Sequence, residues 1–128
     1  MNMKKILTIF LLLFSINGYC EWTKVKEDDE LTRYVDFSSI KRNGNLVRVW
    51  EQSKFKIPQS SSYGNYQSSN LLTEYDCKED KFRILSLIQY SELSGGNIVY
   101  QGQQPTDWIY SPPNSYVSSL SKIICKSK

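Results

Sequence analysis

The side chains that could carry chemistry in this sequence are two cysteines and a pair of carboxylates. Cys77 and Cys125 stand far apart in the chain, whereas Glu74 and Asp76 lie two residues apart. Two carboxylates at that spacing on one strand would share a face, as the acid pair of a glycoside hydrolase must. The sequence contains no histidine, which excludes Ser-His and Cys-His nucleophiles and histidine metal ligands. We therefore interpret the chain as a non-enzymatic module without a metal or other cofactor.

The first twenty residues have the pattern of an export signal. Lys4 and Lys5 precede an apolar stretch over residues 6–14, which is too short to span a bilayer comfortably. Without these two lysines, 14 of the 16 basic residues remain against 13 acidic ones, and such a balance argues against nucleic-acid binding. We predict a signal peptide over residues 1–20 and a single domain over residues 21–128. An uncleaved membrane anchor is the alternative.

The end of the signal decides how the cysteines are interpreted. Gly18 and Cys20 are small residues three and one positions before Glu21, so we predict cleavage after Cys20. Lipid anchoring at Cys20 is the alternative, which the bulky Tyr19 disfavours. Removal of Cys20 leaves an even number of cysteines in an exported chain, and this predicts a disulfide between Cys77 and Cys125. Closing a loop of roughly 50 residues would stabilise the fold by about 4 kcal/mol.

The elements that would position these side chains are six strands and one helix. After two prolines, Ser115 can cap a C-terminal helix, whose expected apolar face consists of Val117, Leu120, Ile123 and Ile124. We expect strands over residues 21–26, 31–37, 46–57, 71–78 and 81–91, and a sixth from residue 98. The chain is thus predicted to have an α+β fold, a six-stranded antiparallel β-sheet with a C-terminal α-helix packed on one face.

Three local patterns carry further expectations. A helical turn is expected over residues 38–42, and a mobile loop over residues 59–70 after Pro58 ends the long strand. On that strand one face is expected to carry Val47, Val49, Phe55 and Ile57, and the other Arg48, Gln52, Lys54 and Lys56. On the next apolar strand Phe82, Ile84, Ile88 and Tyr90 should point one way, and Leu85 and Leu87 the other. A helix covers only one face of a sheet, so we predict a homodimer through the other face.

Short stretches throughout the domain occur in a distinctive order. They are Glu21-Trp22-Thr23-Lys24-Val25, Tyr34-Val35-Asp36, Ser39-Ile40, Asn43-Gly44-Asn45, Val47-Arg48-Val49-Trp50, Tyr75-Asp76-Cys77-Lys78, Arg83-Ile84-Leu85-Ser86, Tyr90-Ser91, and Trp108 before Pro112-Pro113 and the last cysteine. In order and spacing they resemble the surface-adhesin protein E family of Gram-negative bacteria. The resemblance implies a six-stranded sheet with a C-terminal helix, a disulfide between the two matching cysteines, and dimers. It also implies lipid anchoring and adhesion to host vitronectin, laminin or plasminogen.

Three pairs of residues are candidates for binding a protein partner. Tyr63 and Tyr66 lie among serine, glycine, asparagine and glutamine, the composition of antibody loops. Lys54 and Lys56 could meet acidic ligands, although such lysines commonly only solvate a sheet edge. Plasminogen-type modules recognise lysine, so Lys126 and Lys128 are a candidate handle whose alternative is a frayed terminus.

Two further groups of residues have a plainer interpretation. Glu27–Glu30 lacks the ligand spacing of an EF-hand calcium loop, and we expect a solvated turn. Trp22, Trp50 and Trp108 are interpreted as core or dimer contacts rather than sugar platforms. Together the observations predict an exported, adhesin-like protein-binding module at the cell surface or in the periplasm. The alternative is a periplasmic inhibitor or assembly partner that never contacts a host.

Overall fold

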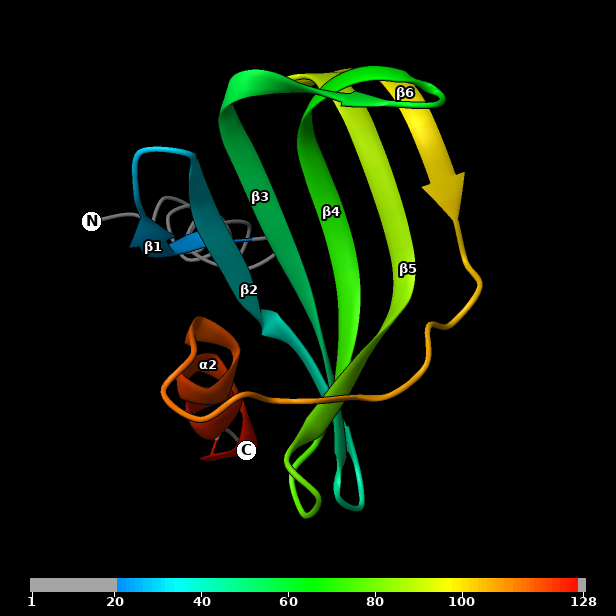
Figure 1. Cartoon of the computed structure of the whole chain (residues 1–128). Helices are drawn as coiled ribbons and strands as arrows, with labels where there is room; N and C mark the ends of the chain where they lie inside the picture. The colour runs from blue at the N-terminus through cyan, green and yellow to red at the C-terminus, as the bar shows by residue number, and fades with distance from the viewer. Residues whose placement is uncertain (1–20, 127–128) are drawn as a thin grey trace, which may run out of the picture.

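The computed structural model describes residues 21–126. Its elements are β1 (Thr23–Glu27), β2 (Leu31–Asn43), β3 (Leu46–Ser61), β4 (Gly64–Asp76), β5 (Lys81–Glu92), β6 (Gly95–Gly102), β7 (Ile109–Tyr110) and α2 (Tyr116–Lys126), shown in Figure 1. This is the predicted α+β architecture, a sheet of six strands with a C-terminal helix, to which the short β7 is added. The predicted signal peptide, Cys20 and Lys128 lie outside the described residues.

All strands belong to one antiparallel sheet in which consecutive strands are neighbours. The order is β1-β2-β3-β4-β5-β6, and β7 pairs with the first two residues of β5. The turns after β1, β3 and β5 therefore lie at one end of the sheet, and those after β2 and β4 lie at the other. We call the first the hairpin end, at the top of Figure 1, and the second the disulfide end, at the bottom.

The core lies between α2 and one face of the sheet, which we call the covered face. Alternate positions on three central strands supply its fully buried residues, Val35, Val47, Val49 and Tyr75, and α2 adds Leu120 and Ile124. This alternation is the period-2 pattern of a strand with one buried side. The predicted contribution of Ile123 is wrong, because the buried stripe of α2 runs through Leu120, Ser121 and Ile124 and leaves Ile123 53% exposed.

Both ends of α2 are fixed as the sequence predicts. The Oγ of Ser115 accepts a hydrogen bond of 3.1 Å from the backbone N–H of Ser118, which is an N-cap. At the other end a disulfide joins Cys125 to Cys77, just beyond β4, with Cα atoms 5.8 Å apart. The guanidinium of Arg42 also donates to the carbonyl oxygen of Cys125, at 2.7 Å. The predicted disulfide is thereby confirmed, and it anchors the helix to the disulfide end.

The predicted helical turn over residues 38–42 is wrong, since β2 runs without interruption to Asn43. The pairing register between β2 and β3 shifts between Asp36 and Lys41. Within this irregular stretch the carboxylate of Asp36 accepts a hydrogen bond from the backbone N–H of Ser38. A side chain that satisfies a local N–H produces the turn-like sequence signal without a helix.

The predicted mobile loop over residues 59–70 is also wrong, because these residues form the far half of the β3–β4 hairpin. β3 continues through Pro58 to Ser61, and β4 begins at Gly64. Pro58 lies where the β3–β4 register shifts, between Lys54 and Gln59. A proline is tolerated at such a bulge because its missing N–H interrupts no ladder hydrogen bond.

A bulge at Leu85 changes which side chains of β5 share a face. Thr73 pairs with Ile84, but the preceding Leu72 pairs with Ser86, so Leu85 has no partner across the ladder. Directly paired residues point the same way. Phe82 and Ile84 therefore face α2, whereas Ile88 and Tyr90 face the opposite side, which we call the open face. The predicted common face for these four residues is wrong, and one extra residue is the reason.

Candidate protein-binding surface

The hairpin end gathers aromatic side chains from two hairpins. The tip of the β3–β4 hairpin bends over β6 at the top of Figure 1, where the two ribbons lie together. The rings of Tyr63 and Tyr100 are 4.7 Å apart between centroids. A β-carbon at Gly64 would lie 3.4 Å from a methyl group of Val99. Tyr63 thus contacts a second hairpin and still keeps 67% of its surface exposed.

Hydrogen bonds hold the tip of the β3–β4 hairpin in one conformation. The hydroxyl of Ser61 donates to the carbonyl oxygen of Gly64 at 2.8 Å, and the same hydroxyl accepts from the backbone N–H of Tyr63 at 3.2 Å. The φ of Gly64 is 131°, in a region that L side chains rarely adopt. The serine-rich and glycine-rich sequence therefore closes a tight turn, and it places Tyr63 at its apex.

The structure separates the two candidate tyrosines. Tyr66 packs edge-to-face against Phe55, with 5.7 Å between ring centroids, and is half-buried. Gln67 next to it donates through its amide to the carbonyl oxygen of Phe55. Of the predicted pair, Tyr63 presents its ring to solvent, whereas Tyr66 fixes the neighbouring strand.

The structure also separates the candidate lysines. The Nζ of Lys54 lies 5.4 Å from the centre of the Tyr34 ring, whereas the Nζ of Lys56 lies 3.5 Å from a carboxylate oxygen of Glu27. Lys126 is the last residue of α2 and is exposed at the disulfide end. The candidate residues therefore occupy several distinct places on the molecule and do not form one site.

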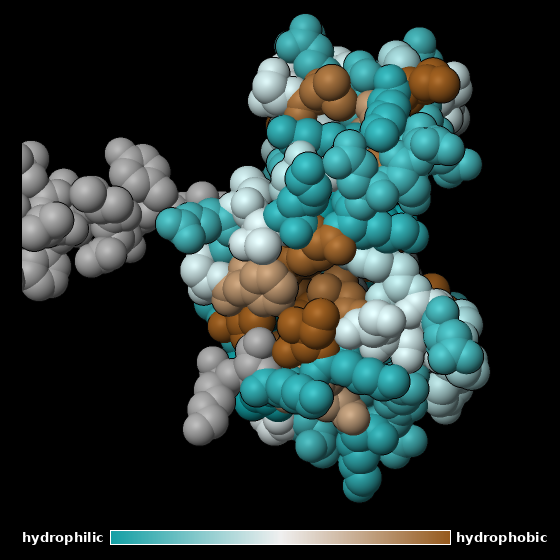
Figure 2. All heavy atoms as spheres, turned by 90° about the vertical axis from the view of Figure 1, so that its left-hand side faces the viewer, coloured by the Kyte–Doolittle hydropathy of each residue, from teal (hydrophilic) through white to brown (hydrophobic). Residues whose placement is uncertain are grey.

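Sequence reasoning missed an apolar component of the hairpin end. The large exposed apolar side chains here are Ile57 at 70%, Ile98 at 56% and Leu93 at 45%. In Figure 2 brown apolar side chains stand among hydrophilic ones at the top of the molecule. Ile57 was predicted to lie on the same face as Val47. It lies at the other end of the long β3, beyond α2 (Figure 1), and its side chain is exposed. Exposed apolar and aromatic groups in a polar surround are typical of protein contact surfaces.

The two carboxylates that could have formed a catalytic pair have separate structural partners. One oxygen of Glu74 accepts a hydrogen bond from Arg48 at 2.8 Å, and the other oxygen accepts from Arg83 at 2.9 Å. Burial would raise the pKa of Glu74, but these two guanidinium groups lower it below the usual value. Asp76 instead accepts hydrogen bonds from the backbone N–H groups of Lys78 and Glu79. Glu74 is thus a buried carboxylate held by two partly exposed arginines, and Asp76 caps the neighbouring turn.

A second buried carboxylate lies on the covered face and was missed at first. Glu51 follows Val47 and Val49 in the alternating pattern, so the signal for its burial was present in the sequence. It is 8% exposed, and its carboxylate accepts a hydrogen bond of 2.8 Å from the hydroxyl of Tyr75. Burial raises the pKa of Glu51, although Tyr75 and the charge of Arg33 stabilise its anion. Glu51 also contributes, after burial, to the raised pKa of about 12 of Tyr116.

Asp28 organises the acidic turn before β2. Asp28 accepts hydrogen bonds from the backbone N–H groups of Glu30 and Leu31, and these bonds lower its pKa. The core interpretation of Trp22, Trp50 and Trp108 is wrong, since all three are half-buried and lie outside the cluster beneath α2. Within residues 21–126, no three metal-binding side chains converge, and no helix is long and apolar enough to cross a membrane.

Comparison with known proteins gives the family of this chain. The sequence model of the surface-adhesin protein E family matches residues 22–126, which covers all eight described elements. The chain belongs to this family, as the resemblance predicted. A search of curated proteins found no match. Membership in this family supports a role as a surface adhesin that binds protein ligands.

Proposed function

We propose that this protein is an exported surface adhesin that contacts its protein ligands through the hairpin end. The observation that carries the proposal is Tyr63, whose ring is two-thirds exposed and yet held by a stack on Tyr100 and a closed turn. An ordered aromatic side chain loses little conformational freedom on binding, and tyrosine is among the residues that dominate interface energies. Family membership supports the adhesin role, and the surface chemistry supports the location of the contact.

The finer parts of the proposal concern export, location and ligand. We infer cleavage of residues 1–20 and display of the domain on the outer surface, where host vitronectin, laminin or plasminogen would be ligands. A periplasmic binding partner is the alternative location for the same surface. Protease shaving of intact cells separates the two, because only an outward-facing domain releases its peptides before lysis.

The binding test uses a matched pair of tyrosines. Tyr110 on β7 is 69% exposed, as Tyr63 is, but it lies along β5 away from the hairpin end. We expect Tyr63→Ala to weaken binding to the immobilised host ligand by about tenfold or more, as loss of a hot-spot residue does. Tyr110→Ala should leave binding unchanged. Equal binding by both variants and the unmodified protein would contradict the proposal.

The basic end of α2 is a second candidate contact, for plasminogen alone. Lys126 is exposed, and a lysine-recognising module requires only an accessible lysine side chain. Removal of residues 126–128 should weaken plasminogen binding and leave vitronectin and laminin binding intact. Binding of plasminogen that survives this truncation would dismiss the lysine handle.

The homodimer remains a prediction, but the structure changes which face of the molecule could form it. Leu87 pairs with Leu71 and faces α2, so it does not present the open-face contact first expected of it. Apolar side chains instead gather in the middle of the face that β1, β2 and α2 present in Figure 2. The partly buried apolar residues that pack against the core include Val25, Phe37, Ile40 and Val117. Sedimentation at micromolar concentration tests the dimer, and a purely monomeric protein would refute it.

A further inference from the structure

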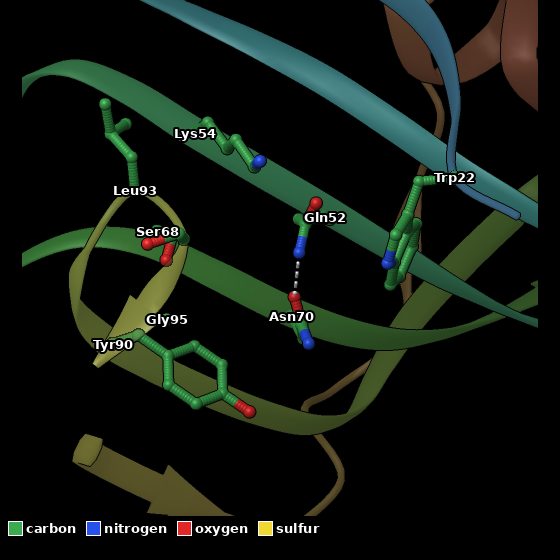
Figure 3. A pocket seen from close by; sticks show the side chains of 9 residues that line it. Trp22, Gln52, Lys54, Ser68, Asn70, Tyr90, Leu93 and Gly95 are labelled. Atoms are coloured by element: carbon green, nitrogen blue, oxygen red, sulfur yellow. Dashed lines mark hydrogen bonds between the residues drawn. The ribbon is translucent and has the colours of Figure 1, made fainter. Parts of the chain in front are cut away.

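The open face of the sheet carries a pocket of mixed polar and apolar lining near the hairpin end. Its volume is about 440 Å³, in the usual range for small-ligand sites. It is lined by Trp22, Gln52, Lys54, Ser68, Asn70, Tyr90, Leu93, Ser94 and Gly95, most of which Figure 3 labels. These residues come from the segment before β1, from three central strands and from the β5–β6 turn.

Two amides form the floor of the pocket. The Nε2 of Gln52 donates a hydrogen bond of 3.0 Å to the Oδ1 of Asn70, drawn as a dashed line in Figure 3. The two residues are direct partners across β3 and β4. Their mutual bond leaves the Oε1 of Gln52 as an acceptor and the Nδ2 of Asn70 as a donor. An adjacent acceptor and donor can bind two neighbouring hydroxyl groups, or a hydroxyl and an acetamido group.

Aromatic rings flank this polar floor. In Figure 3 the indole of Trp22 lies on one side of the amide pair and the phenol ring of Tyr90 lies on the other. Flat aromatic rings provide apolar surface with a polar tip, which matches a pyranose that has an apolar C–H face and hydroxyl edges. The wall beside Tyr90 is fixed because the buried hydroxyl of Ser68 donates to the carbonyl oxygen of Glu92 at 2.6 Å.

One charge stands at the rim. Lys54 makes no ion pair with any residue in the range 21–126, and no carboxylate side chain lines the pocket. The neighbouring lysine on β3, Lys56, is by contrast paired with Glu27. Its ammonium group lies 5.4 Å from the centre of the Tyr34 ring but has no carboxylate partner, and such a group beside the two amides favours a ligand that carries a negative charge.

We propose that this pocket binds one carboxylated sugar unit of a glycan. The ring would pack against Trp22 and Tyr90, its hydroxyl or acetamido groups would bind the Gln52–Asn70 pair, and its carboxylate would pair with Lys54. A terminal sialic acid and an internal uronic acid share this chemistry. The pocket shares Leu93 with the hairpin end but does not include Tyr63. The variants below leave both residues unchanged, so failure of this proposal can be told apart from failure of the protein-binding surface.

The test is titration calorimetry of the disulfide-bonded protein with three soluble sugars. They are 3′-sialyllactose, a glucuronic-acid disaccharide and neutral lactose, each taken to about 10 mM because single-site sugar binding is commonly weak. We expect one of the acidic sugars to bind and lactose to bind at least about tenfold more weakly, as loss of a charge-assisted hydrogen bond predicts. The acidic sugar that binds identifies the source. Binding of neither acidic sugar, or equal binding of lactose, would overturn the proposal.

Variants on one strand provide the control. Lys54→Met should lower the affinity for the acidic sugar by about tenfold, whereas Lys56→Met should leave it unchanged because Lys56 lies outside the pocket. Trp22→Ala should reduce binding and remove a ligand-dependent change in tryptophan fluorescence. Each lysine makes one weak surface contact, Lys54 with the ring of Tyr34 and Lys56 with Glu27, so the unfolding midpoints of the two variants should stay close to each other. A similar loss of affinity in the two lysine variants would indicate unspecific attraction and would refute the site.

Discussion

The two ends of the sheet are built from the same strands and are fixed in different ways. At the disulfide end Cys77 is bonded to Cys125, Arg42 binds the end of α2, and Glu74 holds two arginines. At the hairpin end ordered turns and ring contacts hold the strands, and apolar side chains such as Ile57 remain exposed. The comparison indicates that stability is concentrated at one end, which leaves the other end free to present a surface.

Loss of the disulfide is the largest perturbation of the disulfide end. We expect Cys77→Ser with Cys125→Ser to lower the free energy of unfolding by about 4 kcal/mol, because the unfolded chain loses its cross-link. Urea unfolding measures the change, and reduction of the unmodified protein is its control. The difference between the ends would be refuted if the double variant lost less than about 1 kcal/mol.

Loss of the buried carboxylate at the same end should have the next largest effect. Glu74→Ala leaves Arg48 and Arg83 without their shared anion. Because both arginines keep access to water, we expect the loss of these charge-assisted hydrogen bonds to cost about 2 kcal/mol. Asp76→Ala removes only an exposed cap of two backbone N–H groups, and we expect about 1 kcal/mol. Thermal unfolding of both variants compares two carboxylates on one strand. If both variants lost the same free energy of unfolding, Glu74 and its two ion pairs would contribute no more to stability than the cap formed by Asp76.

Glu51, midway along β3, should make stability depend on pH. Its raised pKa means that the native state binds the proton more tightly than the unfolded state does. The free energy of unfolding therefore falls as the pH rises from the ordinary value of 4.5 through the native pKa. Each unit of the shift corresponds to about 1.4 kcal/mol.

Urea unfolding across this pH range should show that slope, and Glu51→Gln should flatten it. Glu74→Gln is the opposite control, because its native pKa is lowered. The stability that Glu74 contributes is present above its ordinary pKa and disappears as the pH falls through its native pKa. An unchanged slope in the Glu51 variant would assign the pH dependence to other groups.

The smallest effect on stability is expected at the hairpin end. Tyr63→Ala removes the stack on Tyr100, and such pairs contribute about 1 kcal/mol. Urea unfolding should therefore show Tyr63→Ala less stable than Tyr110→Ala by no more than about 1 kcal/mol. A loss comparable to that of the disulfide variant would mean that the hairpin tip is a structural element, and the contrast between the ends would disappear.

Regular alternation could be predicted from the sequence, and local irregularity could not. Val47 and Val49 alternate with polar residues, and they are buried as expected. The irregularities at Pro58 and Leu85 each change the pairing register, and nothing in a period-2 pattern marks an extra residue. These two errors, and the wrong helical turn over residues 38–42, arose where the pairing register between neighbouring strands shifts.

The candidate site was only partly predictable for a similar reason. Tyr63 was found from composition, but its partner Tyr100 lies in another hairpin and is brought near by the bend of β3 and β4. The pocket combines Trp22, Gln52 and Tyr90, which are far apart in the sequence. Spacing along one strand carries no information about such contacts between segments. The unpaired charge of Lys54 likewise becomes visible only once its neighbours are known.

The strand order has a consequence for how the chain assembles. Each strand from β1 to β5 pairs with the one that follows it, so every step in forming these six strands closes only a short stretch of chain. Folding rates rise as contacts become more local. The helix differs, because α2 must pack on strands that lie far before it in the sequence. Its serine-rich turns also have little intrinsic helix propensity. We therefore expect the sheet to form one hairpin after another, and we expect the docking of α2 to be the rate-limiting step of folding.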